Sequence, residues 1–325
     1  LGPQYPGGAR SWWGATNLPE LNLENPAVRQ HVFGAVDSVV RGWLRDGVDG
    51  WRLDVAFDIG FAVLDELTRA AHAEKAGSLV VGEIPNFPKE WFPSVDGVMH
   101  FGLRRILLGM ADGSIDAGHA ARMIDQIIGD ADFEHLLKSW IYLDNHDTAR
   151  QATVVADERQ RRVAQVLQFT LPGSPNLYYG SEVGQTGGDD PEMRGPMRWD
   201  LVEQNHPQLA WTKQLTALRR QRALRVGDYR RLATRELFAF ERHTDRARDS
   251  VVVVANPGSR PVTDLVLMRD SKLMDASHMV DLLGQIEPVT AHAALMPITV
   301  PAHTAVVLQH RSNRDDGYDN YKRVN

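Results

Sequence analysis

The first two thirds of the chain alternate between helix-like spacing of apolar residues and short apolar runs. Apolar positions three or four apart predict helices over residues 26–46, 57–73, 103–110, 157–171 and 206–223. Short apolar runs between them predict strands over residues 48–56, 78–84, 97–101, 140–143 and 175–179. Repeated strand–helix alternation is typical of parallel βαβ units. We therefore expect an α/β region with a parallel sheet.

From about residue 224 the pattern changes to short β-rich runs separated by turn residues. These runs predict strands over residues 237–240, 251–255, 262–267, 279–283 and 305–309. Turn clusters such as Asn256-Pro257-Gly258 separate them. This arrangement predicts a small antiparallel β-sandwich. We expect an α/β region over residues 1–223, an all-β domain over 224–312 and a polar tail over 313–325.

The α/β region offers five strands, whereas a closed (β/α)8 TIM barrel needs eight. We expect strands 4–8 of such a barrel here, with strands 1–3 supplied from upstream of Leu1. An open set of parallel strands would leave unpaired edges, so the sequence is expected to belong to a longer chain.

Composition narrows the function classes. Hydrophobic residues make up 43% and charged residues 24%, as in ordinary globular proteins. A net charge of −6 gives no basic surface for nucleic acid or anionic lipid, and no apolar run is long enough to cross a bilayer. The absence of cysteine excludes disulfides and thiolate metal sites within this sequence. The start at Leu1 carries no signal-peptide pattern and is not Met, so the compartment stays open.

Three acidic residues end or directly follow predicted strands. Alternation along residues 48–55 places Arg52 and Asp54 on one face, where burial is expensive unless a site uses both charges. Glu83 ends the next strand, and Asp147 follows a later one. Because active sites of such barrels lie at the carboxyl ends of the strands, we expect these acids to converge. A structural ion pair of Arg52 with Asp54, a capping role for Glu83 and a turn or metal site around Asp147 are the alternatives.

Five segments resemble, in order, motifs of the α-amylase superfamily of retaining glycoside hydrolases. They are residues 18–22 (LPELN), 49–56 (DGWRLDVA), 82–84 (GEI), 144–147 (DNHD) and 173–184 (GSPNLYYGSEVG). Residues 187–199 (GGDDPEMRGPMRW) are similar to the neopullulanase, cyclomaltodextrinase and maltogenic amylase group. This order and spacing extend over residues 12–310. Residues 84–86 (IPN) and Asn145 depart from the group's pattern, so the cleaved linkage and the balance of hydrolysis and transfer stay open.

The resemblance implies retaining hydrolysis of α-1,4 and possibly α-1,6 glucosidic bonds in starch-derived glucans, maltooligosaccharides or cyclodextrins. It implies that Asp54 is the nucleophile, Glu83 the general acid and base, and Asp147 the transition-state stabiliser. It also implies substrate-binding roles for Arg52, His146, Asp190 and Arg194. Trp91, Trp199, Tyr178 and Tyr179 are candidate sugar platforms, with plain core packing as the alternative.

No cofactor is expected, and no residue of this sequence is assigned to a metal. Calcium could still bind through residues outside it, since a further superfamily motif would lie upstream. The expected partner is an α-glucan, with no nucleic acid or membrane, and an oligomer stays open. An α-glucanotransferase using the same residues is the main alternative. A non-catalytic binding relative is a weaker one, because all three acids are present.

Overall fold

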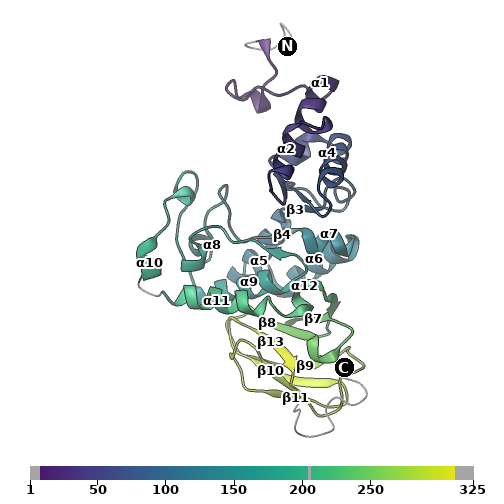
Figure 1. The fold of residues 1–325 in the computed structure, drawn as a ribbon. Coiled ribbons are helices and arrows are strands. Elements are labelled where there is room, and N and C mark those ends of the chain that lie inside the picture. Colours follow the sequence, from purple (N-terminus) through teal and green to yellow (C-terminus); the bar gives the residue numbers. More distant parts are fainter. Residues whose placement is uncertain (1–7, 204–205, 312–325) are drawn as a thin grey trace. The chain divides into compact units, whose positions relative to one another are not determined.

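The computed structural model describes residues 8–203 and 206–311 (Figure 1). The chain divides into two compact units, one of Leu1–Glu83 with Pro93–Asp96 and one of Ile84–Phe92 with Gly97–Asn325. The expected polar tail over residues 313–325 lies outside the described residues. Within the described ranges, no helix combines the length and the apolar character needed to span a membrane.

The first unit joins a helical segment to a pair of parallel strands. Its elements are η2 (Trp12–Gly14), α1 (Pro26–Arg29), the π-helix η3 (Gln30–Gly34), α2 (Val39–Arg45), β1 (Gly50–Leu53), α3 (Ala56–Ile59), α4 (Phe61–Glu74) and β2 (Leu79–Gly82). Strands β1 and β2 pair in parallel, with Gly50 opposite Leu79 and Leu53 opposite Gly82. A Cβ at Gly50 would lie 2.1 Å from the Leu79 carbonyl oxygen, so only glycine allows this close approach.

The two long helices expected in this unit are each interrupted. The first begins as predicted, because the Asn25 side chain accepts from the Ala27 amide and proline takes the first helical position. It ends at Gly34, where Ala35 turns extended with ψ 158°, and a new helix begins at Val39. The second is broken at Gly60, whose φ of +82° belongs to the left-handed region. Continuous helices over 26–46 and 57–73 were therefore wrong.

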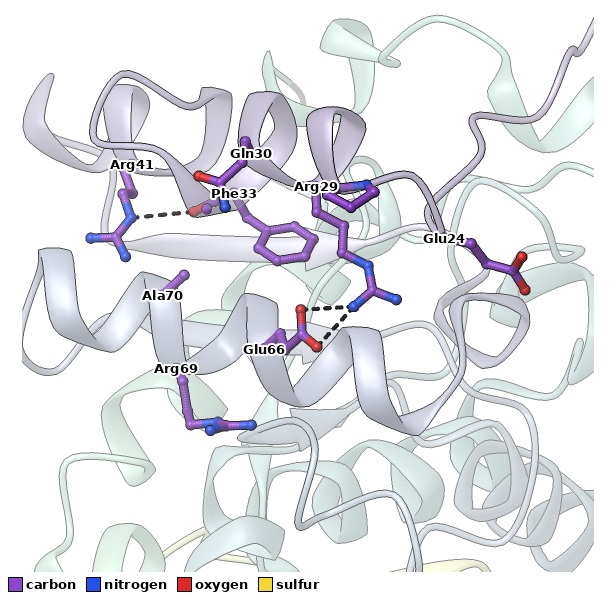
Figure 2. A pocket seen from close by; sticks show the side chains of 10 residues that line it. Glu24, Arg29, Gln30, Phe33, Arg41, Glu66, Arg69 and Ala70 are labelled. Atoms are coloured by element: carbon purple, nitrogen blue, oxygen red, sulfur yellow. Dashed lines mark hydrogen bonds and ion pairs between the residues drawn. The ribbon is translucent and has the colours of Figure 1, made fainter.

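Polar contacts hold the first helical segment against α4. Figure 2 shows the Arg29 guanidinium directed at Glu66, with Nη1 donating to the two carboxylate oxygens at 2.9 and 3.1 Å. Nearby, Arg41 Nε donates to the carbonyl of Phe33, whose ring is buried. These contacts line a cavity of about 490 Å³. The pair of Arg29 with Glu66 thus ties α1 to α4.

The second unit begins with helices and short parallel strands. Its elements up to residue 226 are β3 (Gly97–Val98), α5 (Phe101–Asp112), α6 (Ala117–Asp130), α7 (Phe133–Lys138), β4 (Trp140–Ile141), α8 (Gln151–Val154), α9 (Glu158–Thr170), β5 (Ser174–Pro175), η4 (Ser181–Val183), η5 (Glu192–Arg194), α10 (Trp199–Glu203), α11 (Pro207–Leu218) and α12 (Arg222–Val226). Strand β4 pairs in parallel with β5, and Met99 forms a parallel bridge to Trp140. The strand expected over 175–179 was too long, since β5 ends at Pro175.

An antiparallel sandwich completes the second unit, as predicted. Its elements are β6 (Asp228–Arg231), β7 (Phe238–His243), η6 (Ala247–Asp249), β8 (Val251–Asn256), β9 (Val262–Leu267), β10 (Ser277–Asp281), β11 (Val289–Ala291), β12 (Leu295–Val300) and β13 (Thr304–His310). One sheet has the order β11-β10-β13-β8-β7-β6, and the other pairs β12 with β9. Figure 1 shows β8 and β13 next to one another in this domain. One buried apolar cluster draws residues from both sheets, so the core lies between them.

The other face of β7 rests on the helical part of the unit. Ala239 points into the sandwich core, so Arg242 lies on the opposite face. Its fully buried guanidinium donates to the Thr170 carbonyl at the end of α9 at 2.7 Å and to the Gly227 carbonyl at 2.9 Å. Carbonyl oxygens thus satisfy this buried charge and join β7 to α9.

Two leucines of the sandwich provide a matched test of this core. Leu308 on β13 is fully buried in the cluster, whereas Leu265 on β9 is 49% exposed. We expect Leu308→Ala to lower the free energy of unfolding of the full-length protein by about 2–5 kcal/mol, because it leaves a cavity. Leu265→Ala should change it by less than about 0.5 kcal/mol. Urea unfolding curves measure both, and equal losses would contradict this assignment of the core.

Candidate active site

Parallel pairing brings Asp54 and Glu83 to neighbouring strand ends in the first unit. The ladder continues past the strands, because the Glu83 amide donates to the Leu53 carbonyl at 2.9 Å and the Ala56 amide to the Glu83 carbonyl at 3.1 Å. Val55, which directly precedes Ala56, has φ +44°, a rare conformation for a β-branched residue. Its amide donates to Glu83 Oε2 at 2.9 Å, so the strained turn also fixes a carboxylate.

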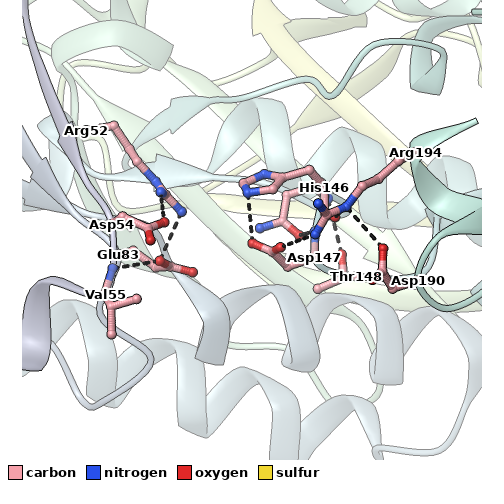
Figure 3. A network of polar contacts seen from close by, with 10 residues as sticks. Arg52, Asp54, Val55, Glu83, His146, Asp147, Thr148, Asp190 and Arg194 are labelled. Atoms are coloured by element: carbon pink, nitrogen blue, oxygen red, sulfur yellow. Dashed lines mark hydrogen bonds and ion pairs between the residues drawn. The ribbon is translucent and has the colours of Figure 1, made fainter. Parts of the chain in front are cut away.

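Arg52 contacts both of these carboxylates. Its Nη1 bonds to Asp54, and its Nη2 forms an ion pair with Glu83 Oε2 at 3.0 Å (Figure 3). The Glu83 side chain is 14% exposed, whereas that of Asp54 is 73% exposed. The predicted shared face of Arg52 and Asp54 is confirmed, and the contact with Glu83 adds to it. The arrangement pairs a sheltered carboxylate with one that is open to solvent.

The second unit gathers the other four predicted residues into a network (Figure 3). His146 Nε2 lies 3.0 Å from Asp147 Oδ2, and Arg194 Nη2 lies 3.1 Å from Asp147 Oδ1. Arg194 Nε donates to the His146 carbonyl at 2.9 Å and lies 3.2 Å from Asp190 Oδ1. Arg194 therefore joins the loop after β4 to the loop before η5. All four side chains are partly open to solvent.

The buried Asp144 side chain anchors this loop, a structural role that was not predicted from the sequence. Its buried carboxylate accepts from the Ser181 hydroxyl at 2.8 Å and from the Gln151 amide at 3.0 Å. Burial raises the pKa of Asp144, and these two donors act against that increase. The Asp147 amide donates to the Asn145 side chain at 3.1 Å. The tight turn that presents Asp147 is thus held from both ends.

The predicted sugar platforms differ in surroundings. Tyr178 and Tyr179 lie with ring centroids 4.5 Å apart, and the buried Arg150 guanidinium lies 4.5 Å from the Tyr178 ring. A cavity of about 620 Å³ beside them is lined by both tyrosines. Trp199 is 67% exposed, and Trp91 is half-buried. A platform role for each stays a prediction.

The fold has structural neighbours among glycoside hydrolases of the TIM-barrel kind. The α-amylase catalytic domain family matches residues 12–211, so the chain belongs to the α-amylase family. The match covers every residue of both site networks.

Named relatives agree with this membership. The chain is 35% identical over 210 residues to neopullulanase 2 of Thermoactinomyces vulgaris, covering 62% of this chain and 34% of that protein. It is 36% identical over 222 residues to a cyclomaltodextrinase of Geobacillus thermopakistaniensis, covering 66% of this chain and 37% of that protein. The native debranching enzyme of Nostoc punctiforme superimposes with a TM-score of 0.82 at 26% identity, over 94% of this chain and 66% of that one. The chain thus spans about a third of these two curated relatives.

One buried titratable residue at a strand end was not selected from the sequence. His100 follows β3, is 4% exposed, and its amide donates to the Trp140 carbonyl at 3.0 Å. Burial lowers the pKa of His100 to about 4. Only its place at the end of the predicted strand over 97–101 could have drawn attention to it.

His100 predicts a pH effect on stability. Its pKa is lower in the folded chain than the ordinary 6.5, so its stabilising contribution is complete above pH 6.5 and declines as the pH falls toward 4. We expect wild type to lose up to about 3 kcal/mol over this interval relative to His100→Gln, whose amide does not titrate. Unfolding curves of both proteins from pH 7 to pH 4 measure the difference. A constant difference would contradict the neutral buried histidine.

Proposed function

We propose that the protein containing this chain hydrolyses α-glucosidic bonds of starch-derived glucans with retention of configuration. The observation that carries the proposal is the pair Asp54 and Glu83, on adjacent parallel strand ends with Arg52 between them. Membership of the α-amylase family supports it. The names neopullulanase and cyclomaltodextrinase among the relatives favour pullulan and cyclodextrins beside maltooligosaccharides as substrates.

In the first step, Asp54 attacks the anomeric carbon, and a bond forms from its carboxylate oxygen as the glycosidic carbon–oxygen bond breaks. Glu83 gives its proton to the departing oxygen. In the second step, Glu83 takes a proton from water, which attacks the same carbon and releases Asp54. Two displacements at one carbon return the α configuration. The greater exposure of Asp54 fits a nucleophile that must reach the sugar.

Arg52 has to release Glu83 during this cycle. The proton-donor role needs a protonated Glu83, which does not suit an ion pair with a guanidinium 3.0 Å away. We infer that substrate binding opens the pair of Arg52 with Glu83 and leaves Arg52 on Asp54. Arg52 then orients the nucleophile, while the Val55 amide continues to hold Glu83.

The network of the second unit supplies substrate contacts in this proposal. Asp147 and His146 take sugar hydroxyls at the cleaved residue and strengthen those bonds as positive charge develops on the ring. Asp190 and Arg194 grip the next sugar toward the non-reducing end. Arg194 also orients Asp147, since it holds the Oδ1 atom and the neighbouring His146 carbonyl.

The same proposal assigns β1 to β5 to strands 4–8 of a (β/α)8 barrel, with the remaining three strands outside this sequence. The parallel pairing of β1 with β2 and of β4 with β5 supports it. Placement of Asp54 and Glu83 directly after β1 and β2 fits the catalytic face of such a barrel.

The catalytic roles are tested in the full-length protein with Asp54→Asn and Glu83→Gln. We expect each to lower kcat/KM on maltooligosaccharides at least ~10³-fold, about 4 kcal/mol of transition-state stabilisation. Asp49→Asn is the matched control, because Asp49 lies just before β1, exposed and paired with Lys75. The anomeric configuration of the first product, followed by proton NMR, should be α.

A substrate with a leaving group that needs no proton separates the two roles. With α-maltosyl fluoride, Glu83→Gln should form the glycosyl-enzyme and accumulate it, because water activation is then impaired, and mass spectrometry would detect the adduct. Asp54→Asn should form none. If wild type transferred most of the glycosyl units to an added sugar acceptor, this result would favour the glucanotransferase alternative. Unchanged rates in both variants would refute the catalytic assignment.

A second pair of variants tests the orientation of Asp147. Arg194→Gln removes the ion pairs to Asp147 and Asp190, and we expect kcat/KM to fall about 10–100-fold. Arg198→Gln removes only a surface ion pair with Asp200 and should leave kcat/KM within about 2-fold. Steady-state kinetics on maltotriose compare them. Equal effects in both would argue against Arg194 as a positioning residue.

A further inference from the structure

A cluster of metal-binding residue types lies in the sandwich domain, away from the residues of the proposed reaction. Glu241 and His243 lie two and four residues after Ala239 on β7, so the three side chains share one face of the strand. Because Ala239 belongs to the sandwich core, this face is directed at the second sheet. Asp270 follows β9 of that second sheet, two residues after the core residue Met268. The three side chains therefore converge from two sheets.

The spacing of the cluster fits one ion. His243 Nδ1 lies 3.7 Å from Glu241 Oε1 and 3.7 Å from Asp270 Oδ2, and one ligand atom of each residue lies within 4.8 Å of the others. These separations are too long for hydrogen bonds. Ligand atoms at 2.0–2.2 Å from a tetrahedral metal lie roughly 3.3–3.6 Å apart. Shifts of a few tenths of an ångström would bring the two pairs that include His243 to that spacing.

Each of the three side chains also has one buried polar atom without a hydrogen-bond partner in the described part of the chain. Among the described residues, Glu241 Oε2, His243 Nδ1 and Asp270 Oδ2 are buried and have no hydrogen-bond partner. Glu241 as a whole is 1% exposed. The Arg230 guanidinium is a cation near Glu241, with Arg230 Nη1 3.8 Å from Glu241 Oε2. A buried carboxylate oxygen without a donor is expensive, and a cation beside it removes that cost.

Neighbouring groups aim the ligands at a common point. The Lys272 amide donates to Asp270 Oδ1 at 2.9 Å, which leaves Oδ2 for the cluster. Main-chain donors of this kind commonly orient metal-binding carboxylates. The positive charges of Arg269 and Lys272 also act on Glu241 and His243, respectively.

We propose that Glu241, His243 and Asp270 bind one divalent transition-metal ion, of which zinc fits best. One imidazole and two carboxylates form a nitrogen and oxygen set that suits zinc and leaves a fourth position for water. The ion joins the two sheets of the sandwich and so has a structural role. The inference is independent of the proposed hydrolysis, and it departs from the expectation that no residue of this sequence binds a metal.

Zinc titration of the full-length protein tests the site. After chelator treatment and dialysis, calorimetry with Zn²⁺ should give one ion per chain with micromolar or tighter affinity and a raised Tm. His243→Ala and Asp270→Asn should each weaken binding at least 10-fold. His292→Ala is the matched control, because His292 Nδ1 lies 3.8 Å from the exposed Asp275 in the same domain. It should bind zinc like wild type.

Two readouts keep the result decisive. The nearly isosteric Asp270→Asn removes one anionic ligand, so weaker binding with an unchanged Tm of the zinc-free form supports coordination. If His243→Ala does not fold, the visible spectrum of the Co²⁺-loaded protein, with and without Asp270→Asn, decides whether Asp270 coordinates. Absence of zinc binding by wild type, an unchanged affinity in Asp270→Asn, or an equal loss in His292→Ala would overturn the proposal.

Discussion

A charge that is taken out of water must find a partner, and this constraint shapes the polar clusters of the structure. Arg52 lies against two carboxylates at neighbouring strand ends. Buried Asp144 accepts from a hydroxyl and a main-chain amide, and buried Arg242 donates to main-chain carbonyls. Because at least one partner of each charge comes from a segment far away in the sequence, satisfying the charge also fixes where a loop or strand lies.

The same constraint separates anchoring residues from those proposed to react. Asp144 is 1% exposed and holds its loop, whereas Asp147, in the same DNHD segment, keeps 38% of its side chain open to solvent. A similar contrast holds between sheltered Glu83 and exposed Asp54. Short connections after strands can present acids to solvent because buried neighbouring side chains hold these connections in place.

The sequence predicted the parts of the fold that depend on local pattern. Short β-rich runs led to β7 to β9, and the apolar run led to β2. The positions of acids at strand ends led to Asp54, Glu83 and Asp147, whereas His146, Asp190 and Arg194 came from the resemblance to the α-amylase superfamily. The break at Gly60 and the helix end at Gly34 were missed, because apolar spacing continues across them. The second contact of Arg52 was missed as well, since it depends on the register of two strands rather than on one segment.

The link from Arg242 to α9 has a consequence for how the chain can be divided. A shortened protein that ended at residue 226 would lose β7, β8 and β13, and with them the contacts that these strands make with α9. The Thr170 carbonyl would lose its hydrogen-bond donor, and the apolar side chains of α9 would become exposed to solvent. Such a truncation should therefore aggregate, so the sandwich protects the apolar surface of α9 from self-association.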